Sequence, residues 1–233
     1  MKDITFLIVA LFILTVPLAG QEHQTITVKA GTRVIDYFPF SEQYRYPEFI
    51  QGKVMFKNGN YTITKLNYCI LQGEMQFIQS KDTLAIANAK DVSFVQIMLD
   101  TFYYDNGYLE VLSGHDPVIM AVKQYVKLSD VQKEGAYGTR SSTSAVQTYS
   151  GIYDQGSLSN NKLVRQEDLV LSRNTDYYIG NSKNGFLTYK KSNVLKLFPL
   201  YKSALEDYLK KNAIDFKAKE DLLQLTKFLQ DIK

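Results

Sequence analysis

Turn signals that recur between short apolar runs are the feature that most constrains how this chain can fold. Asn58-Gly59 follows Val54-Met55-Phe56, and Asp105-Asn106-Gly107 separates two runs rich in tyrosine and leucine. An Asn-Gly pair between apolar runs predicts a β-hairpin, because both residues tolerate the positive φ of a tight turn. From about residue 33 to residue 128 such signals recur every roughly 8 to 12 residues, a spacing typical of all-β folds. We therefore expect an antiparallel β-meander that curls into an open barrel or a sandwich.

Alternation of apolar and polar residues supports strands with one buried side. Met75 and Phe77 alternate with Glu74 and Gln76. Successive side chains on a strand point to opposite faces of the sheet, so this pattern predicts one face against a core and one toward solvent. Strands are expected again between residues 168 and 189, where Asn184-Gly185 indicates a further hairpin.

The hydrophobic period changes near the C-terminus and predicts a helical hairpin over residues 199–232. Pro199 suits a first helical turn, and Asn212 is expected to end the first helix. Apolar residues then recur at spacings of three and four, which places them on one face of each helix; they are Leu200, Ala204, Leu205, Tyr208, Leu209, Leu222, Leu225, Phe228, Leu229 and Ile232. Packing of these faces on the sheet gives a single α+β domain over residues 33–233.

Residues 1–20 have the pattern of a cleavable signal peptide. Lys2 is followed by an apolar run from Ile4 to Val16, and the run ends in small residues before Gly20-Gln21. That order is typical of export, and the run is shorter than the about 20 residues of a membrane span. We expect cleavage near Gly20-Gln21, a flexible N-terminus over residues 21–32, and no stable membrane span afterwards. An uncleaved N-terminal anchor is the alternative.

Residues 133–161 are small, polar and glycine-rich, so they predict a long loop. A loop of this length inside a domain is either functional or mobile. Its glycines have neither the spacing nor the lysine of a phosphate-binding loop, so we expect no nucleotide there.

Few residues of the chain have the patterns that catalysis or metal binding requires. Cys69 is the single cysteine and lies in an apolar strand, where an inert buried thiol is expected. His23 and His115 are the two histidines, and no clustered metal ligands accompany them. Glu74 and Asp100 could form a carboxylate pair, although exposed strand carboxylates are the simpler interpretation. We expect a protein that is not an enzyme, with no catalytic residue, metal or cofactor.

An aromatic segment is the strongest candidate for a binding site. The chain has 17 Tyr, 13 Phe and no Trp, and six rings gather beside two prolines: Tyr37, Phe38, Phe40, Tyr44, Tyr46 and Phe49. Tyrosine combines an apolar ring with a polar tip, which suits a partly wet surface for a protein, glycan or lipid. Alternatively, these rings close one end of the sheet core. A net charge of +3 without a basic stripe does not indicate nucleic-acid binding.

Several stretches resemble a family of secreted Bacteroidota proteins whose function is uncharacterised. They are Lys65-Leu66-Asn67-Tyr68, Gly73 to Ile78, Asp82 to Asn88, Gly135 to Thr139, Leu197-Phe198-Pro199, Ile214-Asp215-Phe216 and Asp221-Leu222. The resemblance covers most of the chain, involves structural motifs only, and implies a Gram-negative envelope with a periplasmic, outer-membrane-associated or secreted location. Asp82-Thr83-Leu84 also resembles the O-glycosylation acceptor of these bacteria, although a strand start explains it as well.

Two classes of function follow from this sequence. The first is a non-catalytic envelope protein that binds a partner protein, lipid or glycan through its sheet face or its aromatic segment. The second is a periplasmic carrier that holds a lipid or a lipoprotein acyl chain between the curved sheet and the helices. Oligomeric state is not determined by the sequence.

Overall fold

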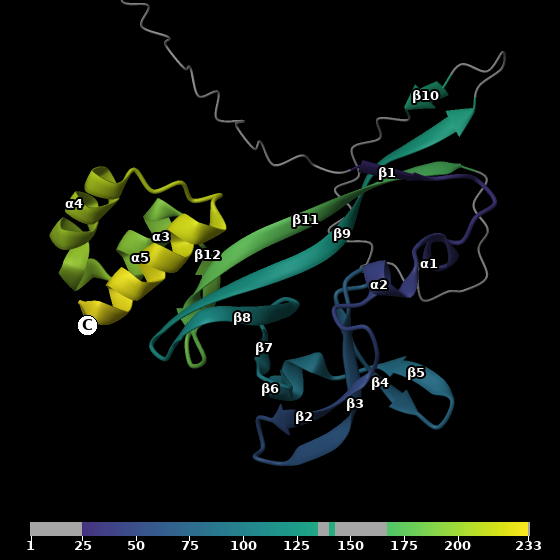
Figure 1. Cartoon of the computed structure of the whole chain (residues 1–233), viewed down its shortest axis with the longest axis horizontal. Helices are drawn as coiled ribbons and strands as arrows, with labels where there is room; N and C mark the ends of the chain where they lie inside the picture. Colours follow the sequence, from purple (N-terminus) through teal and green to yellow (C-terminus); the bar gives the residue numbers. More distant parts are fainter. Residues whose placement is uncertain (1–24, 135–139, 143–166, 233) are drawn as a thin grey trace, which may run out of the picture.

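The computed structural model describes residues 25–134, 140–142 and 167–232 of the chain (Figure 1). The fold is α+β, as expected, with an antiparallel sheet that is open rather than closed and with helices at the C-terminus. The signal-peptide segment and most of the loop expected at residues 133–161 lie outside the described residues.

Two meanders make up most of the sheet, and one non-sequential pairing joins them. Strands are bonded in the order β1-β11-β9-β8-β7-β6-β2-β3-β4-β5, with β10 on β9 and β12 on β11. The first meander comprises β2 (Ile50–Phe56), β3 (Tyr61–Cys69), β4 (Glu74–Gln79) and β5 (Asp82–Ala85). The second comprises β6 (Val92–Ile97), β7 (Asp100–Tyr104), β8 (Tyr108–His115) and β9 (Val118–Glu134). A 3-10 turn, η1 (Ala89–Asp91), leads into β6, which returns to pair with β2.

Hairpin turns lie where the glycine signals predicted them. Gly59 has φ +86° between β2 and β3, and Gly107 has φ +122° between β7 and β8. These backbone conformations are accessible to glycine without steric cost. The Asn58 side chain also accepts a hydrogen bond from the Asn60 amide at 2.9 Å, which tightens the first turn.

A long hairpin of β9 with β11 (Asp168–Asn181) extends the sheet beyond the second meander. Strand β1 (Thr25–Val28) pairs with β11, so residues 25–28 are ordered where the sequence analysis expected a flexible N-terminus. Tertiary packing orders these residues, because Val28 is 1% exposed in an apolar cluster. Most of the other members of that cluster are distant in the sequence, so no local pattern predicts the contact. Residues 133 and 134 likewise continue β9 and pair with β10 (Arg140–Ser142), so these positions are strand and not loop.

Residues 34–43 form two helical turns, although strands were expected from about residue 33. They are α1 (Val34–Tyr37) and α2 (Phe40–Gln43), separated by Pro39. Side-chain bonds favour the turns over an extended chain: Arg33 donates to Asp36. The Gln43 amide donates to the carbonyls of Ile35 and Phe38.

The C-terminal helices pack on one end of the sheet, against β8 and β9 (Figure 1). After β12 (Gly185–Thr188) come α3 (Lys191–Leu197), η4 (Pro199–Tyr201), α4 (Lys202–Asn212) and α5 (Lys219–Asp231). The end at Asn212 is confirmed, and Leu205, Leu209, Leu222, Leu225 and Leu229 of the predicted stripe are buried. The prediction was wrong for Leu200 and Ala204, which are exposed, and Leu200 lies in η4 before α4 begins. Helix α3 was not predicted, because Val194 is its one buried residue. Leu205, Leu209, Leu222, Leu225 and Leu229 fill a cluster with Val118 and Met120 of β9.

No helix in the described part of the chain is both long enough and apolar enough to cross a membrane.

Candidate functional site

The six aromatic residues of the predicted binding segment do not form one surface. Phe38 is 3% exposed and Tyr46 is 6% exposed, so these two rings belong to separate core clusters. Phe40, Tyr44 and Phe49 lie together, with ring centroids 4.5 Å apart for the Phe40–Tyr44 pair and 5.3 Å for the Tyr44–Phe49 pair. Tyr37 stays 46% exposed and contacts only Phe38 among the described ring pairs.

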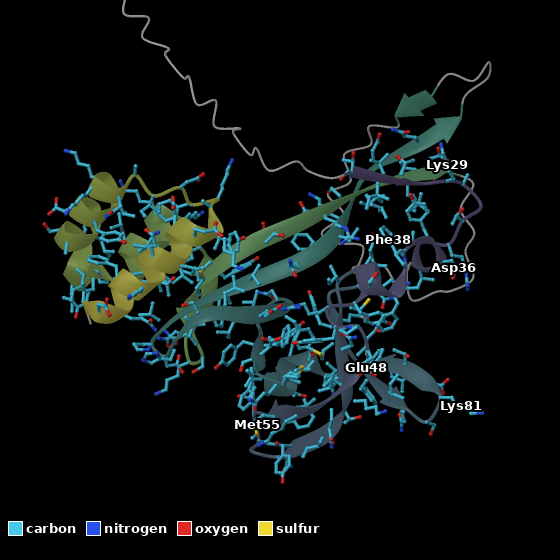
Figure 2. All side chains as sticks on the ribbon, in the orientation of Figure 1. Lys29, Asp36, Phe38, Glu48, Met55 and Lys81 are labelled. Atoms are coloured by element: carbon cyan, nitrogen blue, oxygen red, sulfur yellow. The ribbon has the colours of Figure 1, made fainter. Side chains whose placement is uncertain are left out.

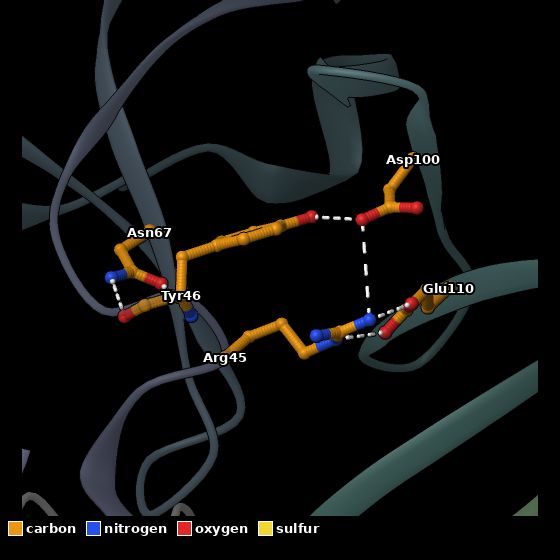
Figure 3. A network of polar contacts seen from close by, with 5 residues as sticks. All are labelled: Arg45, Tyr46, Asn67, Asp100 and Glu110. Carbon is orange, nitrogen blue, oxygen red and sulfur yellow. Dashed lines mark hydrogen bonds and ion pairs between the residues drawn. The ribbon is translucent and has the colours of Figure 1, made fainter. Parts of the chain in front are cut away.

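The Asn67 amide holds the aromatic segment against the sheet (Figure 3). Asn67 is completely buried in β3, and its oxygen accepts the Tyr46 amide at 3.1 Å. Its nitrogen donates to the carbonyls of Tyr46 and Glu48 at 2.9 and 3.0 Å. Pro47 lies in this stretch and has no backbone N–H, so the segment cannot continue a regular ladder with β3. The side-chain amide therefore supplies the hydrogen bonds that a neighbouring strand would otherwise provide.

An ion pair and a tyrosine bond fix the same segment to β7 and β8 (Figure 3). Arg45 donates two hydrogen bonds to Glu110, at 3.0 and 2.9 Å, and Glu110 is 8% exposed. The Tyr46 hydroxyl donates to Asp100 at 2.6 Å, and the Arg45 guanidinium lies 4.0 Å from that carboxylate. Burial, followed by the bond to Asp100, raises the pKa of Tyr46 far above its usual value. The bond to Glu110 raises the pKa of Arg45.

This polar network joins the 45–46 stretch to β7 and β8, and both of its carboxylates, Asp100 and Glu110, have partners. Each carboxylate has a partner on the 45–46 stretch, and the two acids share the single guanidinium of Arg45. Glu74, the other acid considered from the sequence, pairs with Cys69 and lies on the opposite face of the sheet from Asp100. The structure therefore does not bring Glu74 and Asp100 together.

Strand register defines one continuous face, which we call the inner face, across β2 to β8. Val54 pairs with Val95, which pairs with Phe102. On the other side Leu66 pairs with Phe77, which pairs with Leu84. Partners directly across an antiparallel pair project to the same side. The core cluster on this face contains Tyr46, Val54, Leu66, Tyr68, Met75, Val92, Val95, Ile97, Phe102 and Tyr108.

An apolar groove of about 650 Å³ opens on the inner face over β2 to β5. Its lining includes Val54, Leu66, Phe77, Leu84 and Ile86, and none of the described residues that line it is charged. The Arg45–Tyr46 network occupies the part of the inner face over β7 and β8, so this end of the face is polar whereas the end with the groove is apolar. The C-terminal helices pack elsewhere and do not line the groove.

The groove lies beside a free edge of the sheet. Among the strands that the structure describes, β5 pairs only with β4, and all four of its residues are exposed. The Ile86 amide donates to the Met75 carbonyl at 3.0 Å, so Ile86 directs its backbone groups toward β4. Backbone groups of successive residues on a strand alternate between its two sides, so those of Leu84, two residues earlier, also face β4. The backbone amides and carbonyls of Thr83 and Ala85 consequently point outward from the edge. Asp82-Thr83-Leu84, the stretch that resembles a glycosylation acceptor, lies on this strand.

Cys69 is buried in the core, and His115 contacts a side chain of the C-terminal helix α5. Cys69 is fully buried, and burial raises the pKa of its thiol to about 12. His115 lies 3.2 Å from the Gln230 amide, a contact between the β8–β9 turn and α5. His23 lies outside the described residues. Across residues 25–134, 140–142 and 167–232, no group of three His, Cys, Asp or Glu side chains is arranged to hold a metal ion.

One buried polar atom has no hydrogen-bond partner in the described structure. The Tyr108 hydroxyl is buried among the rings of Tyr68 and Tyr104 in the inner-face cluster. Tyr108 does not line the groove. Its hydroxyl lowers the stability of the core, because a buried polar group without a partner loses its hydrogen bonds to water.

The groove was not predicted from the sequence, because the residues that line it come from four strands. Thr62 and Thr64 alternate with Ile63 on β3, and this weak pattern does not show which side is buried. Only the pairing of β3 with β2 and β4 places Val54, Leu66 and Phe77 on one side.

The chain matches no known protein-family model, and comparison with curated proteins and with solved structures gives no significant match.

Proposed function

We propose that this protein is exported to the cell envelope and acts there as a non-catalytic binding module whose site is the inner-face groove. The observation that carries the proposal is the open, uncharged hollow of about 650 Å³ over β2 to β5. This volume lies within the range of about 300–1,000 Å³ that is usual for ligand sites. An occupant that covered this apolar surface would gain roughly 25 cal/mol for each Å² removed from water.

The lining favours an apolar occupant over a glycan. Thr62, Thr64 and Gln79 are its only polar side chains, too few for the many hydroxyls of a sugar chain. Leu84 lines the groove and is 41% exposed, so the site has a large apolar side chain open to solvent. Contiguous apolar surface of this kind is typical of binding sites.

Export is the second part of the proposal and rests on the pattern of residues 1–20. Lys2, the apolar run and the small residues before Gln21 support a cleaved signal peptide and a periplasmic, outer-membrane-associated or secreted protein. Mass spectrometry of the protein from an envelope fraction tests this part. An N-terminus at Gln21 supports export, and an intact Met1 in the cytoplasm contradicts it.

Binding of an apolar fluorescent probe tests the groove directly. The probe is 1-N-phenylnaphthylamine, whose emission rises in apolar surroundings. We expect the unaltered protein to bind it, and Leu84→Asp to weaken binding at least tenfold, because a carboxylate in this lining would be desolvated by the ligand. Leu99→Asp is the matched control, since Leu99 is 95% exposed in the β6–β7 turn and outside the groove. Equal binding by the unaltered protein and Leu84→Asp would contradict the proposal.

A carrier of a lipid or lipoprotein acyl chain is the second candidate function. The groove favours it in one respect, because its floor continues into the buried apolar cluster through Val54 and Leu66. Such a chain would lie on the sheet alone, whereas the sequence analysis expected it between sheet and helices. Lipid extraction of the protein isolated from envelopes tests this role: a stoichiometric acyl lipid that Leu84→Asp loses would support it.

A further inference from the structure

The free edge of β5 and the apolar groove are adjacent and share residues. Leu84 lines the groove with its side chain, while its neighbours Thr83 and Ala85 direct their backbone amides and carbonyls away from β4. The strand contains no proline, and Lys81 projects from the tip of the hairpin rather than along the edge (Figure 2). An edge of this kind is open to pairing with another strand.

The two features together select among the ligands that an apolar groove could accept. An acyl chain would cover Leu84 but would offer nothing to the amides of Thr83 and Ala85. An extended polypeptide can satisfy those amides with its own backbone and direct every second side chain over the inner face. We propose, on the basis that the groove is the binding site, that its partner is an extended polypeptide segment that adds to β5 as a further strand.

The charges around the edge define the chemistry of that segment. The groove is uncharged, so the side chains that point inward must be apolar, because a charge there would lose its hydration without gaining a partner. Lys81 and Asp82 lie side by side at the hairpin end of the edge and offset one another. The segment is therefore neutral, with apolar residues at alternate positions and a paired length of about four to six residues.

A second copy of this chain is a poorer occupant of the same edge. Stable protein–protein interfaces bury about 1,200–2,000 Å² and use roughly 20–30 residues on each side. Self-pairing through β5 would bring together two strands of only four residues each. The contact area is too small for a stable dimer, so a segment of a different protein is the inferred partner.

Two probes and two variants test strand addition by the purified protein. The first probe is a capped, fluorescein-labelled peptide of alternating Val and Thr with a Lys at one end and a Glu at the other, and the second is 1-N-phenylnaphthylamine. Thr83→Pro removes an outward amide without removing a β4–β5 hydrogen bond, and Thr83 does not line the groove, so the edge is altered and the groove is kept. We expect Thr83→Pro to weaken peptide binding at least tenfold and to leave phenylnaphthylamine binding within twofold. Leu84→Asp weakens both.

A modified peptide provides the same test without altering the protein. Methylation of the backbone nitrogens on the peptide's pairing edge removes its donors, and we expect at least a tenfold loss of binding to the unaltered protein. The methylated peptide replaces Thr83→Pro as the test if the melting temperature shows that this variant does not fold.

Each outcome separates this inference from the groove proposal. Equal peptide binding by the unaltered protein and Thr83→Pro, or by the methylated and unmethylated peptides, overturns strand addition. The groove proposal survives that result if phenylnaphthylamine binding still depends on Leu84. If Leu84→Asp changes neither probe, the groove proposal itself fails. A dimer of the protein alone in sedimentation velocity, abolished by Thr83→Pro, assigns the edge to a second copy and overturns the inferred partner.

Discussion

Replacement of Asn67 by alanine removes three hydrogen bonds from a fully buried position, and the structure gives the expected cost. The Tyr46 amide, the Tyr46 carbonyl and the Glu48 carbonyl lose their partner. Glu48 is exposed, so water can replace the lost bond to its carbonyl, whereas Tyr46 is 6% exposed. A buried group left without a partner costs about 1–3 kcal/mol. Two such groups predict that Asn67→Ala lowers the free energy of unfolding by about 2–6 kcal/mol.

Urea unfolding followed by circular dichroism measures this change. Asn174→Ala is the control, because its amide bonds only to the nearby Ser172 and the residue is partly exposed; we expect a loss below about 1 kcal/mol. Asn67→Asp keeps an acceptor for the Tyr46 amide but turns a carboxylate toward two carbonyls. It should be more damaging at pH 7 than at pH 4, where protonation restores a donor. A loss below about 1 kcal/mol for Asn67→Ala would refute the role assigned to this side chain.

Two further predictions concern buried groups. Tyr108→Phe removes a buried hydroxyl that has no partner in the described structure, so we expect the free energy of unfolding to rise by about 1 kcal/mol; a loss of more than about 1 kcal/mol in urea unfolding would show that the hydroxyl is bonded. The Cys69 thiol, with its pKa raised by burial from 9.0 to about 12, should react with a disulfide reagent at pH 8 only when urea unfolds the protein. Since the unfolded thiol ionises first, this group stabilises the fold below pH 9 and loses that contribution as the pH rises toward 12. Rapid labelling of the native protein at pH 8 would contradict the burial of Cys69.

Much of the fold was predictable because its signals are local. The turns at Asn58-Gly59 and Asp105-Asn106-Gly107 depend on glycine at positive φ, and the sequence shows this directly. The C-terminal helices follow from leucines at spacings of three and four, which bury one face of α4 and α5. Both kinds of signal act over a few neighbouring residues and do not require knowledge of the rest of the chain.

The aromatic segment shows where local reasoning was insufficient. Six neighbouring rings predicted either one binding surface or the closed end of one core, but Phe38 and Tyr46 enter different clusters and Phe40, Tyr44 and Phe49 form a third group. Residues 25–28 were expected to be flexible and instead pair with β11. In both cases the structure is set by contacts with residues that are distant in the sequence. Secondary-structure propensity and amino-acid composition do not show which distant residues come into contact.

The amino-acid sequence by itself determined the succession of strands, the hairpins between them and the amphipathic helices, because backbone preference and side-chain periodicity act over short distances. The tertiary structure alone decided that β6 returns to pair with β2, and so which side chains share the inner face. Register is set by contacts that are distant along the chain, and a shift by one residue would turn Leu66 and Leu84 to the opposite side. The groove and the free edge of β5 exist only as a consequence of that register.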